Sequence, residues 1–206
     1  MTKPDQAAFW DERYAPEEYL FGTRPNAFLA QEANRLAPGS KVLAIADGEG
    51  RNSVFLAQKG HSVVATDISQ VAVDKARRLA KKRRVDVDFR LVDLTDWDWP
   101  EEAFDAVIAI FIQFAGPRLR NRMFDNLRRS LKPGGTLLLE GYREEQLGYG
   151  TGGPQAIENL YSEELLYVAF SDWDIELLAS YDAEIEEGTG HSGKSALIDL
   201  VARKPV

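Results

Sequence analysis

The chain has 206 residues, of which 44% are hydrophobic and 28% charged, and its formal net charge is −8. A chain of this length is most simply one domain and can bury a core without covalent staples. The acidic balance argues against a general nucleic-acid-binding protein, whose domains carry a basic face. The absence of cysteine excludes disulfides, thiolate metal sites and cysteine nucleophiles, and we expect no metal.

The N-terminal sequence MTKPDQAAFWDERY contains no apolar run, so it predicts no signal peptide. The longest apolar stretch, AVIAIFI at 106–112, is too short to cross a bilayer. We therefore expect a cytoplasmic protein with no membrane partner. The first 40 residues have helical character, with a helix expected over 25–37 between Pro25 and the pair Pro38-Gly39.

After residue 40, strand-like and helix-like segments alternate. The predicted strands are apolar or alternating runs at 41–46, 61–67, 85–93, 104–114 and 136–142. The predicted helices lie at 52–60, at 69–84 with Ser69 as N-cap, and at 117–132 with Pro117 in its first turn. This alternation with short connections predicts a doubly wound parallel sheet covered by helices.

The C-terminal part departs from this alternation. Residues 174–188 and 194–204 are two further predicted strands joined by only a few residues, and so short a link forces an antiparallel pair. The sheet is therefore expected to be mixed. We expect one domain over 1–206, with a helical lid segment at 1–40 and an α/β core at 41–206.

The turn ADGEGRNS at 46–53 follows the first predicted strand of the core. In open α/β sheets, ligands bind beyond the carboxyl ends of the strands. Gly48 and Gly50 permit positive φ angles and a close approach of the backbone to a ligand. A tight strand-to-helix turn that binds nothing is the alternative interpretation.

Two further acids end the next two strands. Asp67 lies 17 residues after Gly50, where a carboxylate can accept both ribose hydroxyls of an adenosine. Asp93, in LVDL, can reach the exocyclic amine of an adenine, or it can be a solvated loop acid. Carboxylates in three successive strand-end turns favour a bound nucleoside.

The charges of the glycine turn discriminate between nucleoside cofactors. A dinucleotide places its pyrophosphate on the helix N-terminus, where Asp47 and Glu49 would repel it by about 3–4 kcal/mol per contact at an effective dielectric near 20. The third glycine of the dinucleotide pattern is also missing, because Ser53 stands there. S-adenosylmethionine carries a positive amine and a sulfonium but no phosphate, so it is the predicted cofactor.

Several ordered motifs now carry a family resemblance: VLAIADGEGRNSVFLA, VVATDIS, LVDL, FDAVIAIF and LKPGGTLLLE. Together they resemble the class I S-adenosylmethionine-dependent methyltransferases. FWDERY, FGTRPNAFL and EEGTGHSGKSALIDLVARK are similar to a bacterial group near the tellurite-resistance methyltransferases and, more distantly, the thiol and thiopurine methyltransferases. The resemblance covers nearly the whole chain. It implies a Rossmann-like seven-stranded sheet of order 3-2-1-4-5-7-6, with strand 7 antiparallel and helices on both faces.

The resemblance also implies a cofactor site. The Asp47–Gly50 turn would surround the methionine part, Asp67 would hold the ribose, and Asp93 would bind the adenine amine. Ile68 and Leu94 would pack the adenine, and residues 110–113 would line the other side of the cofactor. The full expected set is Asp47, Gly48, Glu49, Gly50, Asn52, Asp67, Ile68, Asp93, Leu94, Ile110 and Gln113. Where the family favours an acid and a glycine, this chain has Ala44 and Ala46, which leaves Asp47, Glu49 or ordered water to hold the ammonium.

Methyl transfer requires alignment and exclusion of water, and a base only when the acceptor must lose a proton. His191, in GTGHSGK, is a candidate base or a donor to an anionic substrate, or else a surface-loop histidine. Arg24 can hold an anionic substrate or the cofactor carboxylate, or be solvated. His61 is expected to be structural.

Tyr142 begins YREEQLGYGTGGP, a glycine-rich stretch at 142–154 that we expect to be a mobile loop bordering the acceptor site, together with Tyr149 and Thr151. The alternative is a crossover linker. The aromatic residues Trp10, Tyr14 and Tyr19 can form a lid over the cofactor or pack an amphipathic helix. The basic run at 74–84 is expected to be a solvated helix face rather than a nucleic-acid site.

The sequence thus predicts a monomeric methyltransferase that passes a methyl group in line to a small-molecule acceptor, with a soft nucleophile or an oxyanion favoured. Two alternatives stay open: a regulatory protein that binds S-adenosylmethionine without catalysis, and a nicotinamide-dependent oxidoreductase.

Overall fold

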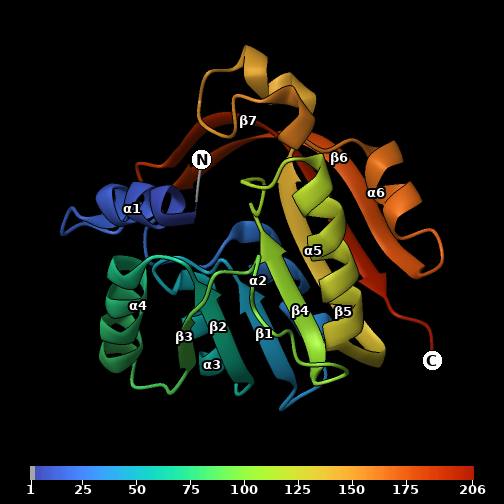
Figure 1. The fold of residues 1–206 in the computed structure, drawn as a ribbon, viewed down its shortest axis with the longest axis horizontal. Helices are drawn as coiled ribbons and strands as arrows, with labels where there is room; N and C mark the ends of the chain where they lie inside the picture. Colours follow the sequence, from blue (N-terminus) through green and yellow to red (C-terminus); the bar gives the residue numbers. More distant parts are fainter. Residues whose placement is uncertain (1–2) are drawn as a thin grey trace. The chain divides into compact units, whose positions relative to one another are not determined.

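The computed structural model describes residues 3–206. The described chain divides into two compact units, one running to Asp98 and including Glu187–Gly190, the other made of Trp99–Glu186 and His191–Val206. Its strands form a seven-stranded sheet of order β3-β2-β1-β4-β5-β7-β6. This order confirms the predicted doubly wound fold (Figure 1), whereas the single-domain boundary stays a prediction.

The first unit contains three parallel strands and the helices that pack on them. In chain order its elements are α1 (Lys3–Tyr14), α2 (Ala27–Glu32), the 3-10 turn η1 (Ala33–Arg35), β1 (Lys41–Ile45), α3 (Arg51–Gln58), β2 (Ser62–Asp67), α4 (Gln70–Arg83) and β3 (Asp88–Leu91). β2 pairs in parallel with β1 and with β3. α4 contacts α1, α3, β2 and β3, as can be followed in Figure 1.

Capping side chains mark the starts of two helices in this unit, α2 and α4. The Ser69 hydroxyl accepts a hydrogen bond from the Ala72 backbone N–H (3.1 Å), which confirms the predicted N-cap of α4. The helix expected from Pro25 begins later, because the Asn26 side chain accepts from the Leu29 N–H (2.9 Å) and caps α2 instead. Capping of this kind satisfies one of the orphan donors at a helix start.

The second unit holds the other strands. Its elements are β4 (Phe104–Ile110), α5 (Pro117–Ser130), β5 (Leu131–Tyr142), the 3-10 turns η2 (Glu144–Gly148) and η3 (Ile157–Asn159), α6 (Glu163–Ala169), β6 (Asp174–Glu187, whose last residue belongs to the first unit) and β7 (His191–Arg203). β4 and β5 are parallel, and α5 packs on both. β5 and β7 are antiparallel, with Leu138 opposite Val201, so the mixed character of the sheet is confirmed.

Several predicted boundaries in this unit are wrong. The strand expected over 104–114 ends at Ile110, and the strand expected from residue 194 begins at His191. The sequence placed a helix to residue 132 and a strand from 136, but α5 ends at Ser130 and β5 begins at Leu131. The Gly134 N–H donates to the Lys204 carbonyl, and the Lys204 N–H donates to the Gly135 carbonyl, both at 2.9 Å. Pairing with the residue after β7 therefore draws the Pro-Gly-Gly segment into the strand. Within residues 3–206, no helix is both long and apolar enough to span a membrane.

Candidate functional site

The turn between β1 and α3 depends on two glycines. Gly48 has φ +60° and Gly50 has φ +87°, a region that side chains with a Cβ rarely occupy. A Cβ on Gly50 would lie 2.7 Å from the Ala76 Cβ in α4, and one on Gly48 would lie 2.8 Å from the Tyr14 hydroxyl oxygen. Neither position of the turn therefore has room for a side chain, and both must be glycine. Ala46, with φ +47°, adopts the same region without being glycine.

Asp67 ends β2 and is 7% exposed. Its Oδ2 accepts from the Gly48 N–H (2.8 Å) and its Oδ1 from the Ser69 N–H (2.9 Å). Burial raises the pKa of Asp67 to about 6, against the lowering effect of the backbone donors of Ser69, Gly48 and Ile68. A carboxylate has about four lone-pair sites, so Asp67 can be anchored to the turn and still accept ribose hydroxyls, as adenosine binding requires.

Asp93 lies at the same end of the first unit. The Val92 N–H donates to the Asp67 carbonyl (2.8 Å), which brings the next residue close to the end of β2. Asp93 Oδ1 accepts from the backbone N–H (2.8 Å) and the hydroxyl (2.7 Å) of Thr95. Ile68 is half-buried and Leu94 is buried. The carboxylates and apolar side chains expected around an adenosine therefore share one region.

The two acids inside the turn already have partners. The Asp47 carboxylate accepts from the Ser53 hydroxyl and from the Ser53 N–H (3.3 Å) at the start of α3, and burial raises the pKa of Asp47 to about 7. Glu49 forms an ion pair with Lys75, and both side chains are 2% exposed. The repulsion of a pyrophosphate estimated from the sequence was therefore too large, because the charge of Glu49 is compensated.

The residues after the turn are also engaged. Asn52 Oδ1 accepts from the Asn26 N–H (2.9 Å), and Arg51 pairs with Glu187 (2.7 Å). The Asn26 side-chain amide donates to the same Glu187 carboxylate (3.1 Å). These contacts fix the start of α3 within the first unit. Arg24, two residues before Asn26, is exposed.

The aromatic residues of the N-terminal segment pack inside this unit. Tyr14 is 4% exposed, its ring stacks on Trp10 with centroids 5.5 Å apart, and its hydroxyl faces Gly48. Burial and the nearby charges of Asp67 and Glu49 raise the pKa of Tyr14. Tyr14 is therefore both packed inside this unit and placed next to the glycine turn.

In the second unit, His191 belongs to a buried aromatic cluster. His191 and Tyr142 are 8% and 1% exposed. The Phe111 ring lies 4.4 Å from the imidazole and 4.6 Å from the Tyr142 ring, between centroids. Phe111 follows β4 in a strained conformation with φ +54°. His191 is therefore not a surface-loop histidine, and strain of this kind clusters at functional sites.

Gln113 fixes the loop after β4. Its Oε1 accepts from the Tyr142 N–H (2.6 Å), and its Nε2 donates to the Tyr142 carbonyl (2.8 Å). Ile110, the last residue of β4, is 8% exposed. Both amide ends of Gln113 are thus committed to the end of β5, and a role in lining the cofactor stays a prediction for both residues.

The glycine-rich stretch after Tyr142 is held by Gln146, which is 1% exposed. Its side-chain N–H groups donate to the Thr151 hydroxyl (3.0 Å) and to the Gly152 carbonyl (3.2 Å), and its Oε1 accepts from the Ala196 N–H (2.9 Å). The Tyr149 hydroxyl donates to Asp182 (2.6 Å). Glycine content alone predicted a mobile loop. The buried side chain of Gln146 anchors this stretch, and no sequence pattern indicated that role.

The structure thus gathers the predicted residues into two groups, one in each unit. The first unit holds the glycine turn with Asn52, Asp67, Ile68, Asp93 and Leu94, while the second holds Ile110, Gln113, Tyr142 and His191. The sequence placed Phe111 in the stretch 110–113 expected beside the cofactor, but it did not predict the contact of Phe111 with His191 and Tyr142. It also did not predict that Lys75 pairs with Glu49.

Known proteins resemble this chain in sequence and in fold. Residues 42–135 match the family model described as a methyltransferase domain. The chain is 30% identical over 176 residues to a demethylmenaquinone methyltransferase of Renibacterium salmoninarum, a match that covers 80% of this chain and 67% of that protein. A second such enzyme, from Clavibacter sepedonicus, matches at 37% identity over 49% of this chain and 40% of its own length.

Among solved structures, one from work on the conversion of a disulfide bond into a thioacetal group during echinomycin biosynthesis has a TM-score of 0.77. It is 23% identical, and the match covers 100% of this chain and 92% of that one. TehB from Haemophilus influenzae has a TM-score of 0.71 at 18% identity, over 97% of this chain and 67% of that one. The chain belongs to the class I S-adenosylmethionine-dependent methyltransferases, with S-adenosylmethionine as its cofactor.

Proposed function

We propose that this methyltransferase acts on a small-molecule acceptor whose reacting atom is a soft nucleophile or an oxyanion. When bound, S-adenosylmethionine supplies a methyl group activated on a sulfonium. The remaining tasks fall to the chain, which must orient the acceptor, exclude water and take a proton where the acceptor carries one. The demethylmenaquinone named for the Renibacterium relative is a small molecule, which supports this class of acceptor.

The observation that carries the proposal is the burial of His191 beside Phe111 and Tyr142. Imidazole is the side chain whose ordinary pKa suits proton transfer near neutral pH. The two rings, with centroids 4.6 Å apart, offer an apolar wall for an acceptor. With a thiol or phenol, His191 would take the proton; with an anionic acceptor, its protonated ring would donate a hydrogen bond.

On the cofactor side, we assign the ribose to Asp67 and the adenine amine to Asp93, with Ile68 and Leu94 packing the base. For the ammonium we favour Asp47 over Glu49. Asp47 is half-buried and its bond to the Ser53 N–H is long at 3.3 Å, whereas Glu49 is 3% exposed and paired with Lys75. Arg24 remains a candidate for anchoring an anionic substrate.

The test is a screen for release of S-adenosylhomocysteine with thiols, selenite, tellurite, halides and small phenols as acceptors. With an acceptor that must lose a proton, His191→Ala should lower kcat by about 100-fold or more and leave cofactor affinity unchanged. His61→Ala is the matched control, because His61 is the chain's other histidine and is equally buried. An unaltered kcat in His191→Ala would refute the role of the imidazole. Cofactor binding without product for any acceptor would instead favour a regulatory protein.

A further inference from the structure

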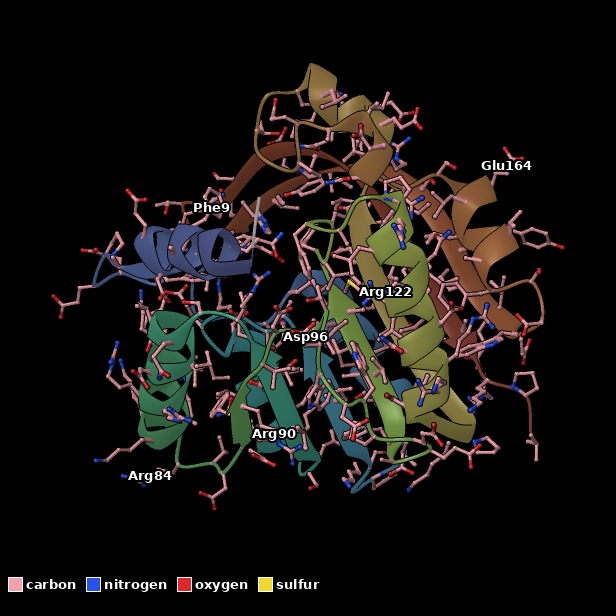
Figure 2. All side chains as sticks on the ribbon, viewed as in Figure 1. Phe9, Arg84, Arg90, Asp96, Arg122 and Glu164 are labelled. Carbon is pink, nitrogen blue, oxygen red and sulfur yellow. The ribbon has the colours of Figure 1, made fainter. Side chains whose placement is uncertain are left out.

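Lys75 is a buried lysine in the middle of α4, 1% exposed. It belongs to the basic run at 74–84, which the sequence predicted to be solvated. Other members conform: Lys81–Arg84 are exposed, and Figure 2 shows Arg84 at the outer end of α4, pointing away from the ribbon. Burying an ammonium is costly unless it is paired and hydrogen-bonded. At this buried position, the Lys75 ammonium therefore needs an ion-pair partner and hydrogen-bond acceptors.

Those partners come from a segment far away in the sequence. Besides the ion pair with Glu49, the Lys75 ammonium donates to the carbonyls of Tyr14 (3.3 Å), Pro16 (2.8 Å) and Glu18 (2.6 Å). These carbonyls lie at and just beyond the end of α1, where backbone acceptors lack helical partners. One side chain of α4 therefore closes the end of α1 and fixes the chain that follows it.

We call residues 14–21 the N-terminal strap. The strap is also tied at its far end, since the Phe21 N–H donates to Glu49 Oε2 (3.5 Å) and the Tyr19 hydroxyl donates to the Lys75 carbonyl (3.1 Å). At its near end, the Tyr14 hydroxyl lies against Gly48. The Lys75–Glu49 pair therefore links the strap to the turn of the cofactor site at both ends.

We propose that Lys75 is a positioning residue for S-adenosylmethionine: with Glu49 it holds the strap so that Tyr14 covers Gly48 in the cofactor turn. The Lys75 ammonium itself faces the carbonyls of the strap rather than the space above the glycine turn. Its loss would release Tyr14 and leave the negative charge of Glu49 beside Gly48 without its partner. Because the pair is buried, its effect should change little between low and high salt, unlike that of a surface ion pair.

The primary test is the dissociation constant of S-adenosylmethionine, measured by calorimetry for Lys75→Met. We expect a rise of about tenfold or more, while Lys81→Met, an exposed lysine on the same helix, should stay within about twofold. If Lys75→Met fails to fold because Glu49 is left unpaired, the double variant Glu49→Gln/Lys75→Met replaces it. That variant removes both charges but still deprives the strap of its donor, so its affinity should fall as well.

A double-mutant cycle separates positioning from general stability. If Lys75 acts through the strap, Lys75→Met should change the dissociation constant by less than about twofold in a Tyr14→Ala background, because coupled sites are not additive. In the wild-type protein, bound cofactor should slow hydrogen exchange at the Gly22 amide, which donates to the Tyr19 carbonyl. Unchanged affinity in a folded variant, fully independent effects of Lys75 and Tyr14, or cofactor-insensitive exchange at Gly22 would each overturn the proposal.

Discussion

Ala46 is a residue whose replacement by glycine should stabilise the protein. It directly follows β1 with φ +47°, where an alanine costs about 1–2 kcal/mol relative to glycine. Glycine, in turn, has more conformational freedom in the unfolded chain, which costs about 0.4–1 kcal/mol. The side chain is half-buried, so a lost methyl group removes little packing. The balance is a gain of about 0.5–1 kcal/mol in the free energy of unfolding for Ala46→Gly.

The assay is equilibrium unfolding in urea, with Ala44→Gly as a matched control. Ala44 lies two residues earlier, inside β1, and is 1% exposed, so the same substitution there should destabilise by about 1 kcal/mol. In a chain of this size, the gain at Ala46 corresponds to a rise of about 1–4 °C in Tm. If Ala46→Gly destabilised the protein as Ala44→Gly does, the strain assigned to this position would be refuted.

Two further predictions concern the same turn. Gly50→Ala should destabilise the protein by more than about 2 kcal/mol, because the added Cβ would lie 2.9 Å from the Ala76 Cα and the backbone is at φ +87°. Urea unfolding measures this loss of stability. A loss smaller than that of Ala44→Gly would contradict the prediction. The pKa of Asp47, about 7 in the folded protein and about 3.9 when unfolded, means that the folded state binds its proton more tightly. Lowering the pH from about 8 to about 4 should therefore raise the unfolding free energy of wild type relative to Asp47→Asn, with a slope of up to about 1.4 kcal/mol per pH unit. A difference independent of pH would show that burial does not perturb this carboxyl.

Much of the fold follows from local pattern. Continuous apolar runs mark β1, β2 and β4, because strands covered on both faces have no polar side. Ser69 marks the start of α4 because its hydroxyl satisfies a backbone donor within one turn. The short link before His191 sets the antiparallel pair. Each of these signals depends on residues close together in the chain.

The charged residues show where local pattern ends. The sequence reads Glu49 as a charge facing a ligand and Lys75 as a solvated base, but the approach of α4 to the glycine turn pairs them. Pairing across 26 residues depends on packing, which no periodicity encodes. Asp67 illustrates the opposite case, since its place at the end of β2 is fixed by a strand pattern and by the distance from the glycine turn.

The departures from the family pattern are also informative. At Ala46 the family favours glycine, and the positive φ angle shows why: the turn keeps its shape without the residue best suited to it. The sequence singled out His191 as a candidate only because the chain has two histidines and this one lies between the last two predicted strands. Its burial beside Phe111 and Tyr142 depends on tertiary packing between segments far apart in the chain, which no local pattern encodes.

The central claim, that the acids at the strand ends hold S-adenosylmethionine, is tested most directly by calorimetric titration of wild type, Asp67→Ala and the exposed-acid control Asp88→Ala. Loss of a charge-assisted contact at Asp67 should weaken binding by about tenfold or more, and Asp88→Ala should stay within about twofold of wild type. NAD should not bind. Cofactor affinity unchanged in Asp67→Ala, or NAD bound as tightly as S-adenosylmethionine, would contradict the account.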